Sequence, residues 1–116
     1  MTKPHPDTLT VMLVDDHLIV RRGLASLISD EADLVVIAEA NSGEEAIAMA
    51  SMHRPDVIVL DLRLRDMSGI EVAEALRGHR ILMLSSFMQE EDVRRVFDAG
   101  IQGYLLKDKD STELLK

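Results

Sequence analysis

The sequence predicts an α/β fold in which helices cover one doubly wound sheet of five parallel strands. Five short segments are almost entirely apolar, a pattern typical of strands that are buried on both faces of a parallel sheet. Segments with apolar residues at helical spacing alternate with them, which predicts right-handed crossovers on both faces of the sheet. The predicted strands are residues 10–14, 34–38, 57–61, 81–84 and 104–106.

The first strand and the first helix follow an N-terminal tail. Residues 1–8 are expected to be flexible because they include Pro4 and Pro6, and residues 9–116 are expected to form one domain. The first helix is expected to start at His17, directly after the aspartate pair that ends the first strand. Its apolar positions, at helical spacing, are Leu18, Val20, Leu24, Leu27 and Ile28.

Capping and helix-breaking residues delimit the next two helices. Ser42, followed three residues later by Glu45, has the spacing of a capping box and predicts the start of the second helix. Pro55 ends that helix, because proline disfavours helical geometry in the residue before it. The third helix is predicted to begin at Gly69 and to stop at Gly78.

Two further helices are predicted in the C-terminal part of the chain. Val93, Val96 and Phe97 form the apolar face of a fourth helix, between the fourth and fifth strands. A last helix is expected to open at about Ser111. The chain stops at Lys116 inside this helix, so we expect it to be part of a longer protein.

Polar residues end four of the five predicted strands, at one edge of the sheet. They are Asp15, Asp16, Asp61, Ser85 and Lys107. Five such units most often adopt the flavodoxin-like strand order 2-1-3-4-5, in which the first and third strands are neighbours. Each residue alone has a structural explanation, as a helix cap, a turn residue or a solvated charge. Together they predict a binding site at this edge.

The residue types at this edge suit the transfer of a phosphoryl group. Three carboxylates repel one another unless protons or a cation neutralise them, and an oxygen-only ligand set suits Mg²⁺. Lys107 offers a positive charge to a phosphoryl oxygen, while Ser85 offers a hydroxyl and Ser86 a backbone N–H. One carboxylate is left to act as the nucleophile. Phosphoryl transfer depends mainly on such positioning and charge neutralisation.

These motifs resemble the receiver domain of two-component response regulators over nearly the whole chain from Leu9. The motifs that carry the resemblance are Leu13-Val14-Asp15-Asp16-His17, Asp61, Gly69, Leu84-Ser85-Ser86 and Gly103-Tyr104-Leu105-Leu106-Lys107. The resemblance implies a CheY-like receiver fold. The Asp-Asp-His and Gly-Tyr-Leu-Leu-Lys-Asp segments are similar to those of the NarL/FixJ subfamily. Its members usually join the receiver to a LuxR-type helix-turn-helix DNA-binding domain.

The resemblance implies a signalling role in which Asp61 is the phosphoacceptor. Asp61 would receive a phosphoryl group from a histidine of a sensor histidine kinase and form an acyl phosphate. Asp16 would bind Mg²⁺ directly and Asp15 largely through water. Asp61 and the backbone carbonyl of Arg63 would complete the ligand set.

The resemblance also implies how the phosphorylated state is held and read. Ser85, Lys107 and the backbone of Ser86 would contact the phosphoryl oxygens. Tyr104 would be the switch aromatic, whose rotamer follows Ser85. Such a module is not an enzyme beyond its own phosphoryl transfer and autodephosphorylation. Phosphorylation is expected to shift self-association toward a homodimer, and DNA would be bound only through a C-terminal domain beyond this chain.

Three features depart from the pattern of the family. Leu64 and Arg65 occupy places where family members often carry Met-Pro, and Asp108 follows Lys107 where many receivers have proline. Residues 76–80 also form a shorter connection than expected. None of these departures removes a chemical group from the predicted site.

Composition and charge restrict the other classes of function. The 13 basic and 21 acidic residues give a net charge of −8, which argues against direct binding of nucleic acid or an anionic membrane by this segment. The absence of cysteine is compatible with a reducing compartment. The early apolar run is too short for a membrane span. We therefore expect a cytoplasmic protein.

Three alternatives fit the residues less well. A haloacid-dehalogenase-type phosphatase needs an aspartate where this chain has Arg63. A flavodoxin-like cofactor binder needs a hydroxyl- or glycine-rich phosphate loop after the first strand, where Asp15 and Asp16 stand instead. A degenerate receiver that only binds proteins has no need of the acids, serine and lysine that are all present.

Overall fold

The described part of the chain folds around one parallel sheet. A computed structural model describes residues 8–61, 64–85 and 103–106. The strands are β1 (Leu9–Val14), β2 (Leu34–Ala40), β3 (Val57–Asp61), β4 (Arg80–Ser85) and β5 (Gly103–Leu106), and the helices are α1 (Leu18–Ser29), α2 (Gly43–His53) and α3 (Gly69–Ala75). The strand order is β2-β1-β3-β4-β5 and every neighbouring pair is parallel. The predicted sheet and its strand order are confirmed.

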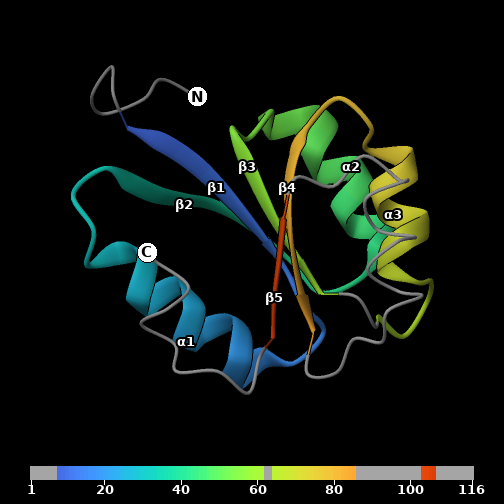
Figure 1. Cartoon of the computed structure of the whole chain (residues 1–116), viewed down its shortest axis with the longest axis horizontal. Helices are drawn as coiled ribbons and strands as arrows, with labels where there is room; N and C mark the ends of the chain where they lie inside the picture. The colour runs from blue at the N-terminus through green and yellow to red at the C-terminus, as the bar shows by residue number, and fades with distance from the viewer. Residues whose placement is uncertain (1–7, 62–63, 86–102, 107–116) are drawn as a thin grey trace.

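Helices cover both faces of the sheet, with α1 on one face and α2 and α3 on the other (Figure 1). Val11 and Leu13 of β1 pack on the side of α1, together with Leu24 of that helix. Met12 and Val14 belong to the core cluster on the opposite face. This period-two alternation explains why β1 is apolar at successive positions: both of its faces are buried. Within the described ranges no helix has the length and apolarity to cross a membrane.

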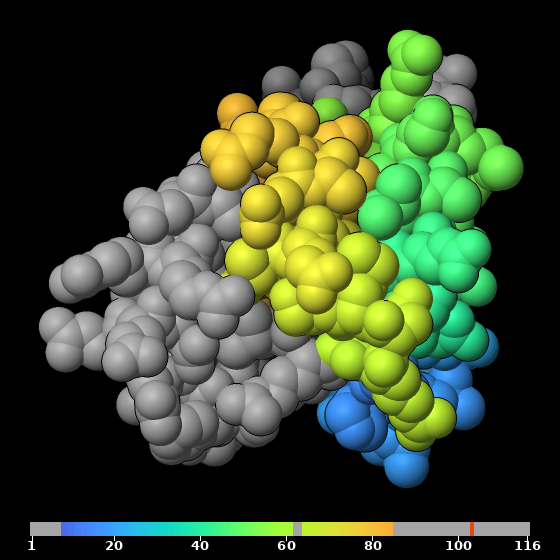
Figure 2. All heavy atoms as spheres, turned by 90° about the vertical axis from the view of Figure 1, so that its right-hand side faces the viewer, coloured from blue at the N-terminus to red at the C-terminus, as the bar shows by residue number. Residues whose placement is uncertain are grey.

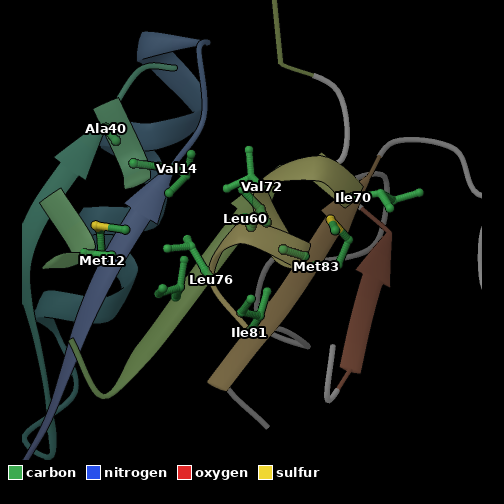
Figure 3. Packing of buried hydrophobic residues seen from close by; sticks show 13 residues of the cluster. Met12, Val14, Ala40, Leu60, Ile70, Val72, Leu76, Ile81 and Met83 are labelled. Carbon is green, nitrogen blue, oxygen red and sulfur yellow. The ribbon is translucent and has the colours of Figure 1, made fainter. Parts of the chain in front are cut away.

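The larger core cluster lies between the sheet and the pair formed by α2 and α3. These two helices lie beside one another on the surface over this cluster (Figure 2). Figure 3 shows how their apolar side chains meet those of the central strands. The buried members are Met12, Val14, Ala40, Ala46, Ala50, Ile58, Leu60, Ile70, Val72, Ala73, Leu76, Ile81 and Met83.

Strand boundaries agree with the sequence patterns to within two residues. β2 continues to Ala40 because that residue is buried and pairs with Val14 of β1. α3 ends shortly before Gly78, whose φ of +105° is one that glycine adopts without strain. Thr8, which we assigned to the tail, is buried. Residues 1–7 and the predicted fourth and last helices lie outside the described residues.

Caps at both ends of α2 confirm the boundaries predicted for it, with two differences. Ser42 Oγ accepts a hydrogen bond from the backbone N–H of Glu45 at 3.1 Å. The Glu45 carboxylate accepts from the N–H of Asn41 at 3.0 Å, one residue earlier than in a standard capping box. At the other end, Arg54 has a φ of 47°. The residue before Pro55 therefore leaves the helix through the left-handed conformation.

A hydrogen-bonded clip joins β1 to the start of β3 at the amino end of the two strands. The carboxylate of Asp56 accepts from the backbone N–H of Thr10 at 2.8 Å and from its hydroxyl at 3.0 Å. In return, the N–H of Asp56 lies 2.9 Å from both the hydroxyl and the carbonyl oxygen of Thr10. Thr10 is buried, so these bonds satisfy polar groups that have left water.

Candidate functional site

The carboxyl ends of β1 and β3 bring the predicted carboxylates together. The two strands are adjacent and Val14 pairs with Leu60, so the residues that follow them, Asp15 and Asp61, emerge side by side. A compact set of ligand atoms lies within 4.8 Å of one another, one each from Asp15, Asp16, His17 and Asp61. The contact between the first and third strands, on which the predicted site depends, is confirmed.

Burial makes this group of carboxylates costly without a counter-charge. Asp15 and Asp61 are 2% and 3% exposed, and the side chain of Asp16 is 7% exposed. Like charges repel strongly at this separation when they are shielded from water, and a divalent cation relieves that repulsion. Three carboxylates form a hard oxygen donor set of the kind that Mg²⁺ prefers. The residues present therefore fit a magnesium ion.

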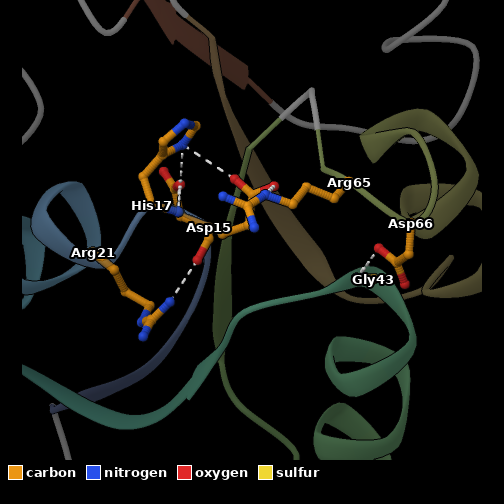
Figure 4. Close-up of polar contacts among 7 residues, drawn as sticks. Asp15, His17, Arg21, Gly43, Arg65 and Asp66 are labelled. Carbon is orange, nitrogen blue, oxygen red and sulfur yellow. Dashed lines mark hydrogen bonds and ion pairs between the residues drawn. The ribbon is translucent and has the colours of Figure 1, made fainter.

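His17 links the two aspartates that follow β1. It is the N-cap of α1, and its backbone N–H donates to Asp15 Oδ1 at 2.8 Å. Its ring Nδ1 lies 3.1 Å from Oδ1 of both Asp15 and Asp16 (Figure 4). α1 begins at Leu18 with His17 as its N-cap, within one residue of the predicted start, and neither aspartate is its N-cap.

Arg21 supports the backbone of the site from α1. Its Nη1 donates to the backbone carbonyl of Asp15 at 2.7 Å, and its Nε donates to Glu39 Oε1 at 3.0 Å. The side chain is only 13% exposed and reaches from the helix toward Asp15 in Figure 4. No local pattern predicts this ion pair, because Glu39 lies on β2, 18 residues away along the chain.

Asp66 connects the segment after β3 to the start of α2. Its carboxylate accepts from the backbone N–H of Gly43 at 2.9 Å and from that of Glu44 at 3.0 Å (Figure 4). These hydrogen bonds, the one from Gly43 first, hold the pKa of Asp66 below its ordinary value of 3.8. A Cβ atom at Gly43 would overlap the side chain of Met67 and lie 2.8 Å from that of Val72. The loop and the helix are therefore in tight contact.

Arg65 directs a positive charge toward the same group of carboxylates. Its Nε lies 3.5 Å from Asp16 Oδ2. In the space-filling view, the yellow-green segment before α3 reaches the blue residues at the beginning of α1 (Figure 2). In the sequence, Arg65 stands out only as a departure from a family pattern. No local signal indicates either this contact or the Asp66 cap, since each joins residues that are far apart in the sequence.

The remaining predicted residues lie at or beyond the ends of β4 and β5. Asp61 pairs with Leu84, so Ser85 follows one residue beyond the level of Asp61. Tyr104 lies in β5, which ends one residue before Lys107. The roles predicted for these side chains stay predictions. The predicted site residues outside the described part of the chain are Arg63, Ser86 and Lys107.

Comparison with known proteins places this arrangement among signalling domains. Residues 11–116 match the family described as the response regulator receiver domain. The chain is 39% identical over 111 residues to the response regulator protein VraR of Staphylococcus aureus. That match covers 92% of this chain and 53% of VraR, so the chain spans about half the length of this relative.

Solved structures of response regulators share the fold of this chain. A two-component response regulator of the LuxR family from an Aurantimonas species has a TM-score of 0.89 and 37% identity, covering 93% of this chain and 80% of that one. The receiver domain of a response regulator described as NarL, from Mycobacterium tuberculosis, has a TM-score of 0.89 and 33% identity. There the match covers 95% of this chain and 92% of the other.

Proposed function

Because this chain belongs to the response regulator receiver domain family, we propose that it is a phosphorylation switch whose phosphoacceptor is Asp61. The observation that carries the proposal is the position of Asp61, which is buried at the end of β3 beside the carboxylates of Asp15 and Asp16. A carboxylate that accepts a phosphoryl group needs neighbouring positive charge to offset the incoming oxygens. The three carboxylates together supply a binding site for a cation, and the cation offsets the charge of those oxygens.

The proposed reaction transfers a phosphoryl group from a phosphohistidine of a sensor histidine kinase. One carboxylate oxygen of Asp61 attacks the phosphorus atom. The P–N bond to the kinase histidine breaks, and its electron pair stays on the histidine nitrogen. The product is an acyl phosphate, which water later hydrolyses to the carboxylate and inorganic phosphate. The chain catalyses nothing beyond this self-phosphorylation and autodephosphorylation.

The side chains around Asp61 are proposed to hold the metal in place. Mg²⁺, when bound, neutralises the carboxylates and the phosphoryl oxygens. Asp16 would hold it directly and Asp15 largely through water, and Asp61 and the backbone carbonyl of Arg63 would complete the set. His17 orients Asp15 through the hydrogen bond from its backbone N–H.

The ends of β4 and β5 are proposed to recognise the phosphoryl group. The hydroxyl of Ser85 and the backbone N–H of Ser86 donate to its oxygens, and the ammonium group of Lys107 pairs with them. Tyr104 changes rotamer when Ser85 is engaged and so reports the state of the site at the surface. The phosphorylated form then self-associates as a homodimer.

We further propose that the whole protein regulates transcription. The relatives include response regulators described as belonging to the LuxR family, and VraR is about twice as long as the matched segment. In this proposal a DNA-binding domain lies outside the present chain, and the net charge of −8 leaves DNA contact to that domain. A bacterial transcription regulator acts in the cytoplasm, where the DNA is.

Acetyl phosphate tests the proposal without knowledge of the kinase. The protein is incubated with acetyl phosphate and Mg²⁺ and its intact mass is measured. We expect one phosphoryl adduct that depends on Mg²⁺, that peptide mapping assigns to Asp61, and that Asp61→Asn abolishes. Asp30→Asn, which changes an exposed aspartate at the end of α1, is the matched control and should keep the adduct. An undiminished adduct on Asp61→Asn would disprove the assignment.

Sedimentation tests the proposed dimer. Wild-type protein at one concentration is compared with and without acetyl phosphate and Mg²⁺. We expect the phosphorylated sample to sediment faster, and Asp61→Asn to sediment as the untreated wild type does. Identical sedimentation of a sample shown by mass to be phosphorylated would refute homodimerisation of this domain as the response.

A further inference from the structure

A positively charged side chain already contacts one of the carboxylates that would bind the metal. Arg65 Nε lies 3.5 Å from Oδ2 of Asp16. The two partners differ in exposure, since the Arg65 side chain is 84% exposed and that of Asp16 is 7% exposed. The guanidinium therefore approaches a nearly buried carboxylate from the solvent side.

The residues that follow Arg65 hold it near this position. The carboxylate of Asp66 binds two backbone N–H groups at the start of α2, at 2.9 Å and 3.0 Å. The side chain of Met67 packs against Gly43 so closely that a methyl group on that glycine would overlap it. Fixing the backbone next to Arg65 reduces the entropy that its side chain loses when it pairs with Asp16.

A bound divalent cation and the Arg65 guanidinium compete for the same carboxylate. Both are attracted by the negative charge of Asp16, and a cation held between Asp15, Asp16 and Asp61 repels a second positive charge beside it. Arg65 can leave toward water because most of its side chain is exposed. Cation binding therefore includes the release of Arg65 from Asp16.

We propose that Arg65 is a built-in competitor that lowers the affinity of this site for Mg²⁺, an inference that rests on the magnesium site proposed above. Arg65 neutralises part of the acidic group when the metal is absent. It thereby raises the Mg²⁺ concentration at which the site fills. Because the ion pair is exposed on one side, we expect the effect on the dissociation constant to be about threefold.

Calorimetric titration of Mg²⁺ into the phosphate-free protein tests this inference at constant low ionic strength. We expect Arg65→Gln to bind Mg²⁺ about threefold more tightly than the wild type. Arg22→Gln is the matched control, because Arg22 is also an exposed arginine and its Nη1 lies 4.0 Å from Glu39 Oε2 rather than beside an aspartate of the site. Unchanged or weaker binding by Arg65→Gln, or an equal gain in Arg22→Gln, overturns the inference.

The NMR signal of the Arg65 Nε–H group provides a second readout that does not depend on affinity alone. In the wild type we expect Mg²⁺ to move this signal toward its position in Asp16→Asn, with the same midpoint as the backbone amide of Asp61. An Arg65 signal that stays in place while the Asp61 amide titrates overturns the competition. If neither the wild type nor Arg65→Gln binds Mg²⁺, the proposed metal site fails as well, which distinguishes that result from failure of the competitor alone.

Discussion

Asp56 and Asp61 stand at opposite ends of β3, and their surroundings differ in kind. The carboxylate of Asp56 faces donors: the N–H and the hydroxyl of Thr10 both bind it. Asp61 lies with two other carboxylates, Asp15 and Asp16, and with the ring of His17. The first arrangement stabilises the folded chain by itself, whereas the second gathers negative charge that a cation relieves. The two ends of β3 thus differ in local charge: the donors of Thr10 hold Asp56, and Asp61 stands in a group of three carboxylates.

The largest change in stability is expected from removing the carboxylate of Asp56, before the start of β3. Asp56→Ala leaves the buried N–H and hydroxyl of Thr10 without these acceptors, so we expect the free energy of unfolding to fall by about 3 kcal/mol. Urea unfolding measures this change. Asp33→Ala, at an exposed aspartate in the turn before β2, should change it by less than about 0.5 kcal/mol. If Asp56→Ala lowered the free energy of unfolding no more than Asp33→Ala does, the hydrogen bonds between Thr10 and Asp56 would contribute little.

A somewhat smaller loss of stability is expected from a substitution at Gly43, where the loop after β3 meets α2. In Gly43→Ala the added methyl group would overlap Met67 and crowd Val72, so we expect a destabilisation of about 2 kcal/mol from overpacking. Gly23→Ala is the matched control, because a Cβ at Gly23 meets nothing within 4 Å. Alanine is also the better helix former, so that variant should be neutral or slightly stabilised. Equal stability of Gly43→Ala and Gly23→Ala would contradict the tight packing.

At Asp61, the other end of β3, we expect a substitution to raise the free energy of unfolding rather than lower it. Asp61→Asn removes one of three crowded negative charges, so in the presence of a chelator we expect the protein to become more stable by on the order of 1 kcal/mol. Mg²⁺ should cancel or reverse this difference, because a cation at ten times its dissociation constant stabilises the wild type by about 1.4 kcal/mol. Chemical unfolding with and without Mg²⁺ measures how the substitution and the cation each change the free energy of unfolding. A chelator-treated Asp61→Asn that is less stable than the wild type would break the contrast with Asp56.

The smallest effect concerns Asp66, a carboxylate that faces donors but is exposed. Its pKa in the folded protein lies below 3.8, chiefly because of the hydrogen bond from Gly43. A depressed pKa means that the stabilisation is fully present above the ordinary value and is lost as the pH falls through the lower, folded value. We therefore expect Asp66→Asn to lose less stability than the wild type when the pH is lowered from about 5 to about 3. A carboxyl titration by NMR that gives Asp66 a pKa at or above 3.8 would contradict this.

Local pattern was sufficient for most of the backbone in the described part of the chain. Each apolar run predicted a strand within two residues of its observed ends, because burial on both faces of a parallel strand requires apolar side chains at successive positions. Ser42 and Pro55 marked the ends of α2 because capping and proline geometry act over a few residues. The meeting of Asp15 with Asp61 was also predictable, since it follows from strand order and the common direction of parallel strands.

The side-chain hydrogen bonds between distant segments depended on the tertiary structure. Asp66 binds an N–H 23 residues away, and Thr10 binds Asp56 across 46 residues. No periodicity in the sequence encodes such pairs, because they arise only after the sheet has placed the loops and helix ends beside one another. The sequence by itself determined the apolar strands of the core and the arrival of Asp15, Asp16 and Asp61 at one edge of the sheet. Only the packed fold decided that Arg65 would meet those charges, since such a contact depends on the relative positions of separate elements.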